Sequence, residues 1–351
     1  MKKLKIVERT KVNARAKVSA PPLHRAARHK KPTTLALLLD QGADLSARDK
    51  NGATPLHLAA RNKNPAVPAL LLDRGADLSA RDKNDRTPLH LAARFNENPA
   101  ALALLLNQGA DLAARDKFGT TPLHDAAAYN KDPAIAALLL DRGADLSARN
   151  KNGYTPLHLA AWGNQNPAVP ALLLDRGAEI SAREKFGGTP LHLTASEHQN
   201  NPAVPALLLD RGAKISARDG LGATPLHLAA YQRNPAVPAL LLDRGADPNA
   251  RNKNGWTPLH DAAQGIGNLA VLTLLLDRGA DPNARNKNGE TPLHEAARNW
   301  QNPAAAALLL DRGADATLRD NLNRLPVDMV NETSSLRDTN VYQRLNAAYQ
   351  T

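Results

Sequence analysis

A block of residues recurs along the sequence, and this repetition limits the fold more than any other feature. Each block opens on Thr-Pro, and the spacings between successive threonines are 33, 34, 34, 34, 35, 33 and 34 residues. These threonines are Thr54, Thr87, Thr121, Thr155, Thr189, Thr224, Thr257 and Thr291. A fixed period in this range is typical of solenoids, in which each unit packs mainly on its neighbours. We therefore predict an elongated stack of small units instead of a compact globule.

The first half of a block predicts a short helix. Thr54 supplies an N-cap hydroxyl, and Pro55 suits the first helical position because its missing N–H would have no partner there. Leu56, Ala59 and Ala60 form a small apolar face, which lets neighbouring helices approach closely.

The second half of a block predicts an apolar helix followed by a loop. Asn64 and Pro65 restart the chain, residues 70–72 are all leucine, and Gly75 suits a left-handed position that ends the helix. The polar segment that follows, ADLSARDKNG in residues 43–52, ends in Asn-Gly and predicts an extended, hairpin-like loop. The aspartate before each Arg-Gly is expected to form a solvated pair with arginine at the helix end.

Some units carry a further proline directly after Asn-Pro-Ala-Val. These prolines are Pro68, Pro170, Pro205 and Pro238. Proline lacks an N–H and disfavours helical angles at the residue before it. We therefore expect the second helix of these units to begin at that proline.

The opening TPLHxAA, the close LLLDRGAD and the period together resemble the ankyrin repeat. The resemblance covers residues 21–324 in nine units. It implies an all-α solenoid of stacked helix-turn-helix units with projecting β-hairpin loops.

Both flanks of the repeats are degenerate. Residues 1–20 form a basic arm and a degenerate half-repeat, because residues 12–24 align with residues 45–57. Residues 325–351 predict a capping repeat or helix, in which Leu325 replaces the threonine and Asp328 replaces the histidine. Its final helix carries Val341, Leu345 and Ala348 at helical spacing, which suits a cover for the last leucine face.

Composition excludes several classes of protein. There is no cysteine, so disulfides and cysteine nucleophiles are ruled out. No apolar run reaches the length of a membrane span or a signal-peptide core, so we expect no membrane span and no signal-peptide export. We expect the protein to be a monomer and to lie in the cytoplasm, of its own cell or of a host cell if it is a delivered bacterial effector. Of the net charge of +11, a large share falls in residues 1–19, where seven basic residues face one glutamate.

One histidine recurs at the same place in every unit. The set is His24, His57, His90, His124, His158, His192, His227, His260 and His294. Ligands of one metal ion must lie within about 2 Å of it, and successive units are several times farther apart. We expect local hydrogen bonds from these rings and no metal or cofactor. The segment 294–298, HEAAR, lacks the second histidine of a zinc protease, and no other catalytic motif is present, so we expect no enzymatic activity.

Two positions vary freely between units, which predicts that they are exposed. The residue before Thr-Pro is in turn Ala53, Arg86, Thr120, Tyr154, Gly188, Ala223, Trp256, Glu290 and, before Leu-Pro, Arg324. The end of the first helix is in turn Arg61, Arg94, Ala128, Trp162, Ser196, Tyr231, Gln264 and Arg298. A core position could not accept glycine, glutamate and tryptophan alike.

The aromatic residues of the repeats gather at the loops and at the ends of the first helices. In ankyrin repeats these two regions line the concave face that holds partners, so the resemblance implies partner contacts for Phe95, Phe118, Tyr129, Tyr154, Trp162, Phe186, Tyr231, Trp256, Trp300 and, beside them, Arg86. Exposed aromatics are common at interface hot spots, although some of these could instead fill gaps between units. The densest cluster is Phe118, Tyr129, Tyr154, Trp162 and Phe186.

Two functions fit this pattern. The first is a non-enzymatic scaffold that binds a folded protein on the concave face, with a basic surround that favours an acidic partner. The second is a polyanion or nucleic-acid binder that uses the basic N-terminal arm and a ladder of loop Arg/Lys pairs such as Arg48 and Lys50. An acidic residue often separates the members of a pair, which favours a solvated, locally paired face over a phosphate track.

Overall fold

The computed structural model describes residues 21–29, 32–195, 201–265, 269–298, 303–331, 337 and 339–349. The basic arm of residues 1–20 lies outside the described residues, so its interpretation stays a prediction. The chain divides into two compact units, Met1–Glu179 and Ile180–Thr351. The repeat pattern itself continues through both.

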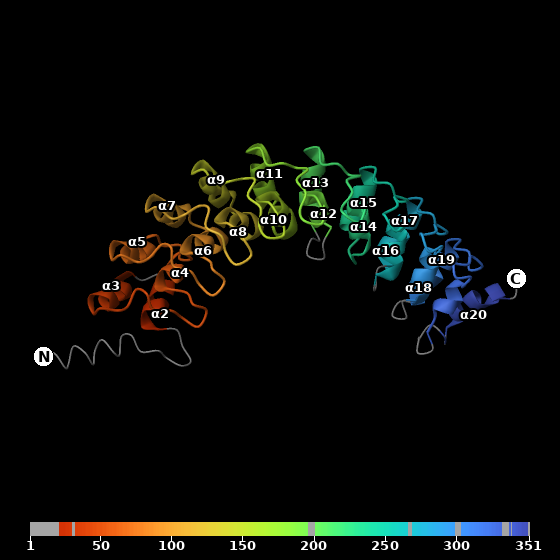
Figure 1. Cartoon of the computed structure of the whole chain (residues 1–351), viewed down its shortest axis with the longest axis horizontal. Helices are drawn as coiled ribbons and strands as arrows, with labels where there is room; N and C mark the ends of the chain where they lie inside the picture. Colours follow the sequence, from red (N-terminus) through yellow and green to blue (C-terminus); the bar gives the residue numbers. More distant parts are fainter. Residues whose placement is uncertain are drawn as a thin grey trace. The chain divides into compact units, whose positions relative to one another are not determined.

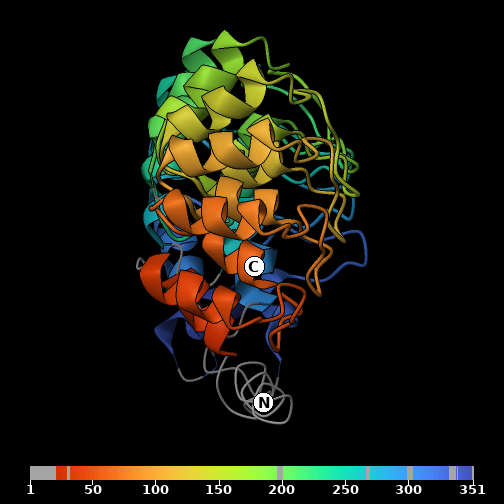
Figure 2. The same ribbon diagram turned by 90° about the vertical axis from the view of Figure 1, so that its left-hand side faces the viewer.

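Pairs of short helices alternate along the first compact unit, with the first helix of each pair in one row and the second helix in another (Figure 1). The first helices are α2 (Pro22–Arg28), α4 (Pro55–Ala59), α6 (Pro88–Phe95), α8 (Pro122–Tyr129) and α10 (Pro156–Gly163). The second helices are α3 (Pro32–Asp40), α5 (Ala66–Asp73), α7 (Pro99–Asn107), α9 (Pro133–Asp141) and α11 (Ala168–Asp175). In Figure 2 the red-to-yellow helices of this unit stack along one side of the view, and the loops that connect the units project to the opposite side.

The second compact unit repeats the same alternation. Its first helices are α12 (Pro190–Leu193), α14 (Pro225–Ala230), α16 (Pro258–Gln264) and α18 (Pro292–Arg298). Its second helices are α13 (Ala203–Asp210), α15 (Ala236–Asp243), α17 (Leu269–Asp277) and α19 (Pro303–Asp311). The short 3₁₀ helix η1 (Pro326–Met329), the helix α20 (Asn340–Asn346) and the 3₁₀ turn η3 (Ala347–Tyr349) follow.

The predicted helix boundaries are confirmed at both ends of a unit. Thr54 is extended, with φ −86° and ψ 167°, and Pro55 takes the first helical position of α4. Gly75 follows the end of α5 with φ +83°, the left-handed region that glycine enters without steric cost.

The prediction for the extra prolines was wrong. In their units the second helix begins at the alanine two residues earlier, as α5 does at Ala66, and the preceding valine is helical. Pro68 therefore stands third in α5, where its N–H would have no helical partner in any case. It is also buried, at the core position that Leu102 fills in α7. Proline is thus a packing residue here.

The core consists of leucine and alanine between neighbouring helices. Leu56, Ala59 and Leu71 are 1%, 0% and 0% exposed. Of the three leucines in 70–72, the outer two are only half-buried, because a single side of the helix faces the stack. The described residues contain no β-strand, so the fold is an all-α repeat solenoid, as predicted.

The loops between units are hairpin-like turns closed by backbone hydrogen bonds. The N–H of Asp49 donates to the carbonyl of Ala53 at 3.0 Å, and the N–H of Gly52 donates to the carbonyl of Asp49 at 2.9 Å. Adjacent turns are also joined, because the N–H of Lys83 donates to the carbonyl of Asn51 at 2.9 Å.

Helix-end aspartates form ion pairs, but with an arginine of the next unit, not with the arginine beside them in the sequence. Asp141 pairs with Arg176 at 2.7 Å, and Asp243 pairs with Arg278 at 2.6 Å. The sequence could not show this, because both arginines stand at the same position in neighbouring units.

Past residue 324 the chain covers the last helix pair. Val341 and Leu345 of α20 are buried, at 5% and 0% exposed, in the same apolar cluster as Leu309. Asp328 does stand in for the histidine, because its Oδ2 accepts the N–H of Leu325 at 2.7 Å. The Ala348 side chain lies outside the described residues.

Candidate partner-binding surface

The repeated histidines bind neighbouring units together. Nδ1 of His57 accepts the N–H of Thr54 at 3.1 Å and lies 2.8 Å from its hydroxyl oxygen. Nε2 of His57 donates to the carbonyl of Arg86, in the next unit, at 2.9 Å. The ring is therefore neutral, with its proton on Nε2. The predicted local hydrogen bond is confirmed, and the bond to the next unit adds to it.

Burial holds most of these rings in the neutral form. Desolvation lowers the pKa of His124 and His260 to about 4, although each ring donates to a carbonyl that favours its protonated form. Burial likewise lowers the pKa of His57, His90, His192, His227 and His294. These groups are structural, because both nitrogens are already used and neither faces solvent.

A second row of buried polar side chains joins units in the first compact unit, and the sequence reading missed it. Nδ2 of Asn130 donates to the carbonyls of Ala93 at 2.9 Å and Asn96 at 2.8 Å, both in the preceding unit. Its Oδ1 accepts the N–H of Asp132 at 3.0 Å. Asn62, Asn96 and Asn164 occupy the same position and donate in the same way. The signal was an asparagine two residues before each Asn-Pro or its equivalent.

The loop arginines hold the loops in place. Nη1 of Arg81 donates to the carbonyl of Asp85, in its own loop, at 2.8 Å and to that of Arg115, in the next, at 2.7 Å. Equivalent pairs of acceptors serve Arg48, Arg115, Arg183, Arg218 and Arg251. The predicted pairing with the intervening acidic residue was wrong at Asp49, whose Oδ1 accepts the N–H groups of Asn51 and Ala53 instead.

The expectation that both variable positions are exposed was wrong for several units. Before Thr-Pro, Ala53, Thr120, Ala223 and Glu290 are buried, at 4%, 9%, 6% and 5% exposed. At the end of the first helix, Ala128 is 1% exposed. The residue before Thr-Pro can vary because only its backbone carbonyl is used. That carbonyl accepts a hydrogen bond from the histidine of the preceding unit, whatever the side chain is.

The aromatic residues fall into two groups. Phe95, Phe118, Tyr129, Phe186 and Tyr231 are exposed, between 42% and 67%. Tyr154, Trp162 and Trp256 are half-buried, and Arg86 is half-buried as well. Trp300 lies outside the described residues. In the predicted cluster, Phe186 belongs to the second compact unit and the other four members to the first.

The half-buried rings before Thr-Pro lie against the repeated histidines. The ring centroids of Tyr154 and His158 are 5.9 Å apart, and those of Trp256 and His260 are 5.7 Å apart. Part of each of these two rings therefore packs on the histidine of its own unit.

Arginine and aromatic side chains stack at the ends of the first helices in the first compact unit. The guanidinium carbon of Arg61 lies 4.3 Å from the ring centroid of Phe95, and that of Arg94 lies 3.6 Å from the ring centroid of Tyr129. Arg94 also lies 5.3 Å from Phe95. Such contacts attract through the ring quadrupole and fix the orientation of the cation.

Asp125 lies beneath this stack and was missed from the sequence. It is 3% exposed, and its Oδ1 is 3.6 Å from Nη1 of Arg94. Its Oδ2 and the Nε of Arg94 are buried without a hydrogen bond. Burial raises the pKa of Asp125 to about 7, against the opposing charge of Arg94. The signal was TPLHD, in which aspartate replaces the usual leucine after histidine.

Arg86 is fixed by its own loop. Its Nε and Nη2 donate to Oδ2 of Asp82 at 2.9 and 2.7 Å, and Asp82 is 5% exposed. Burial favours the neutral form of Asp82, but hydrogen bonds from Arg86 outweigh it and lower the pKa.

The second compact unit carries acidic residues at equivalent places. Arg298 donates to Glu290 at 2.5 Å and to Glu295 at 2.7 Å, and Oε1 of Glu295 is buried without a hydrogen bond. Burial raises the pKa of Asp261 well above its usual value, and the charge of Glu295 adds to that effect.

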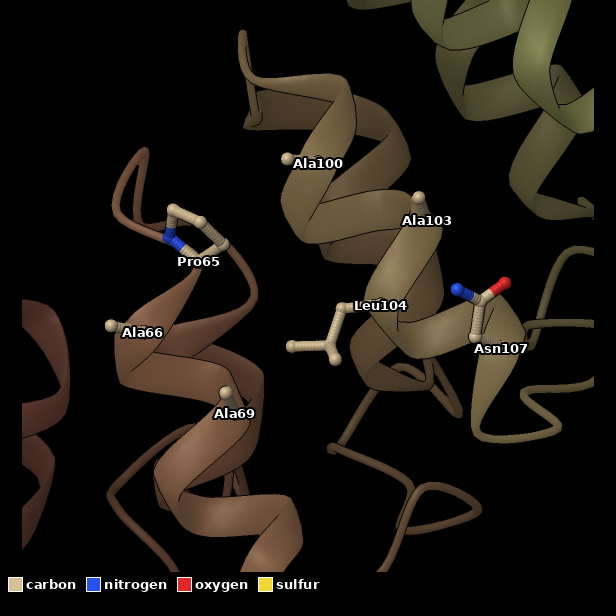
Figure 3. Close-up of a pocket in the computed structure, with 7 residues that line it drawn as sticks. All are labelled: Pro65, Ala66, Ala69, Ala100, Ala103, Leu104 and Asn107. Atoms are coloured by element: carbon tan, nitrogen blue, oxygen red, sulfur yellow. The ribbon is translucent and has the colours of Figure 1, made fainter.

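No described group of histidine, aspartate and glutamate side chains could hold a metal ion. One apolar groove of about 430 Å³ lies between α5 and α7, on the side of the second helices (Figure 3). Its walls are Pro65, Ala66, Ala69, Ala100, Ala103, Leu104 and Asn107. None of these seven residues carries a titratable or nucleophilic side chain.

Stacked helix pairs tied by buried histidines define a helical repeat protein. A family model described as ankyrin repeats (3 copies) matches residues 23–116, 89–184, 166–252 and 235–320. The chain therefore belongs to the ankyrin repeat family, and the resemblance is confirmed. A comparison with curated proteins finds no match.

Ankyrin repeats generally mediate contacts between proteins, and the family is typically one of non-enzymatic scaffolds. Within the described ranges, no helix combines the length and the apolar character needed to cross a bilayer.

Proposed function

We propose that this chain is a scaffold that binds a partner protein through its loop tips and the ends of its first helices. This surface, called the loop-helix surface below, carries every aromatic side chain named above as exposed in the repeats. The observation that supports the proposal best is the set of large exposed rings, with Phe118 at 58% and Phe186 at 67%. Large rings exposed to water cost solubility, and a partner that covers them gains their apolar area.

The proposal assigns the aromatic residues different roles. Phe95, Phe118, Tyr129, Phe186 and Tyr231 are the anchors. Tyr154 and Trp256 contribute less, because part of each ring already packs on a histidine. The exposed Leu221 and Leu322, at 69% and 71%, stand at the loop position that Phe118 and Phe186 occupy and extend the apolar contact.

Nucleic-acid binding along the loop arginines is the second candidate. These side chains remain exposed, but Nη1 of Arg81 already donates to two backbone carbonyls, so this guanidinium is less able to follow a phosphate backbone. Binding that falls steeply with salt and ignores sequence would favour this candidate.

Capture from nuclease-treated cell lysate tests the proposal. The intact chain should retain a protein, and Phe118→Ala with Tyr129→Ala should lose most of it. Leu37→Ala is the matched control, because Leu37 is 58% exposed on α3, on the second-helix side. Equal recovery by the intact chain and the double variant would overturn the choice of anchors, and retention that depends on nucleic acid would overturn the function.

A further inference from the structure

Three consecutive units carry an arginine at or next to the end of the first helix. Arg28 is the last residue of α2, Arg61 lies two residues past the end of α4, and Arg94 is the penultimate residue of α6, whereas the next unit has Ala128 at this position. Burial lowers the pKa of Arg61, and the positive charges of Arg28, Arg86 and Arg94 lower it further. The four guanidinium groups therefore concentrate positive charge on one part of the loop-helix surface.

Two members of this cluster lack an anionic partner. Arg86 is paired with Asp82, and Arg94 lies 3.6 Å from Asp125. The side chains of Arg28 and Arg61 form no ion pair or hydrogen bond with any residue in the described ranges. The arginines at the ends of the second helices behave differently, because Arg74, Arg176, Arg244, Arg278 and Arg312 each pair with an aspartate of the preceding unit.

The spacing between the arginines of successive units indicates what conformation a ligand would need to contact all three. Packed helices lie about 8 to 10 Å apart, so the three arginines present one cation per such step. A polyproline II segment rises about 9 Å in three residues and returns the same face after each turn. One carboxylate at every third residue would therefore meet Arg28, Arg61 and Arg94 in turn.

We propose that Arg28, Arg61 and Arg94, with the ring of Phe95 between them, bind an extended acidic segment of a partner protein that carries a carboxylate at every third residue. Guanidinium groups bind carboxylates through paired, charge-assisted hydrogen bonds. The exposed part of Phe95, at 42%, offers an apolar contact for the residues between the acids. The inference deepens the proposed function and rests on it only in taking the ligand to be a protein.

The test uses the full chain and a fluorescent peptide of three Glu-Pro-Pro triplets. We expect binding at low salt, about tenfold weaker in Arg28→Gln with Arg61→Gln. The control, Arg74→Gln with Arg142→Gln, removes the same charge from the second-helix side and should change the affinity by less than about twofold. A peptide with the same composition but three consecutive glutamates should bind more weakly than the spaced one. Unchanged urea midpoints verify that both double variants fold.

Equal losses in the two double variants, or equal binding of the two peptides, would overturn the inference. So would single-stranded DNA that binds more tightly than the spaced peptide with the same dependence on Arg61. Unchanged binding of the spaced peptide by the Arg28→Gln, Arg61→Gln variant, with a lysate protein still captured, would refute the site but leave the scaffold function standing. Arginine-dependent peptide binding without any captured protein would support the site and count against that function.

Discussion

The imidazole of His57 donates from Nε2 to the backbone carbonyl of Arg86 at 2.9 Å, so a side chain of one unit fixes the loop of the next. Its Nδ1 must stay unprotonated, because it accepts the N–H of Thr54. Protonation of Nδ1 would place its new N–H directly against the N–H of Thr54. The stack therefore depends on neutral rings.

Stability should accordingly fall in mild acid. The folded chain lowers the pKa of the buried histidines, so on acidification the unfolded chain takes up protons first. Their stabilising effect is complete above about pH 6.5 and is lost as the pH falls toward the folded values. For His124 and His260, with pKa about 4, the loss between about pH 7.5 and 5 should be about 2 kcal/mol each.

Urea unfolding at the two pH values measures this effect. His124→Gln should show a smaller pH dependence than the unmodified chain, whereas His29→Gln should not, because His29 is exposed beyond α2. An identical pH dependence in all three chains would show that the histidine network does not carry the effect.

Asp125 should act in the opposite direction. Its pKa is raised to about 7 in the folded chain, so the folded state holds its proton longer than the unfolded state does. Its contribution is complete below about pH 4 and is lost as the pH rises through about 7. Asp125→Asn cannot ionise and should be more stable than the unmodified chain by about 1 to 3 kcal/mol at pH 8, with little difference at pH 4. A less stable variant at pH 8 would mean that the attraction to Arg94 outweighs burial.

The repeat fold could be predicted because the same helix-start and helix-stop residues recur in successive units. The Thr-Pro start and the Gly75 stop follow from local rules of helix capping, and both are confirmed. The second helix was predicted to begin at Pro68, but it begins two residues earlier. A proline in the first turn of a helix loses no helical hydrogen bond, so the rule that proline breaks a helix interior does not apply there.

The asparagine row should be a large contributor to stability in the first compact unit. Asn130→Ala removes two donated bonds and one accepted bond at a side chain that is 3% exposed, and it leaves two carbonyls without that donor. We expect a loss of about 2 to 4 kcal/mol in urea unfolding. Asn152→Ala, at an exposed loop tip, should change stability by less than about 0.5 kcal/mol. Similar effects at the two positions would contradict the role of the row.

Substitutions that add or remove a glycine at a loop or helix end should change the stability of the chain in a direction set by the backbone angles and the nearby atoms. Asp85 has φ +60° at a place where other loops have glycine, so Asp85→Gly should stabilise by about 0.5 to 1 kcal/mol. Gly119→Ala should destabilise more than Gly143→Ala. A Cβ at Gly119 would lie 3.1 Å from the backbone nitrogen of Lys151, whereas one at Gly143 would meet nothing within 4 Å. Thermal unfolding of the three variants gives the order, and a destabilised Asp85→Gly would refute the strain.

The site was harder to predict than the fold because a position can vary between units for two reasons. Its side chain can be exposed, or only its backbone can be used. The position of Glu290 varies between units, yet this residue is buried in a network with Arg298, and only its carbonyl is common to all units. Exposure at Phe118 and burial at Ala128 depend on neighbours one unit away, which a single unit does not show. Asp125 breaks the leucine pattern after histidine, and that departure was the visible signal of the charged layer under Tyr129.

Hydrogen–deuterium exchange of the full chain, with and without its captured partner, tests most directly whether the loop-helix surface is where a partner binds. Bound partner should slow exchange in the loop tips around Phe118 and at the ends of α6 and α8, while α5 and α9 keep their free rates. Protection confined to the second helices, with unchanged exchange at the loop tips, would contradict the proposed surface.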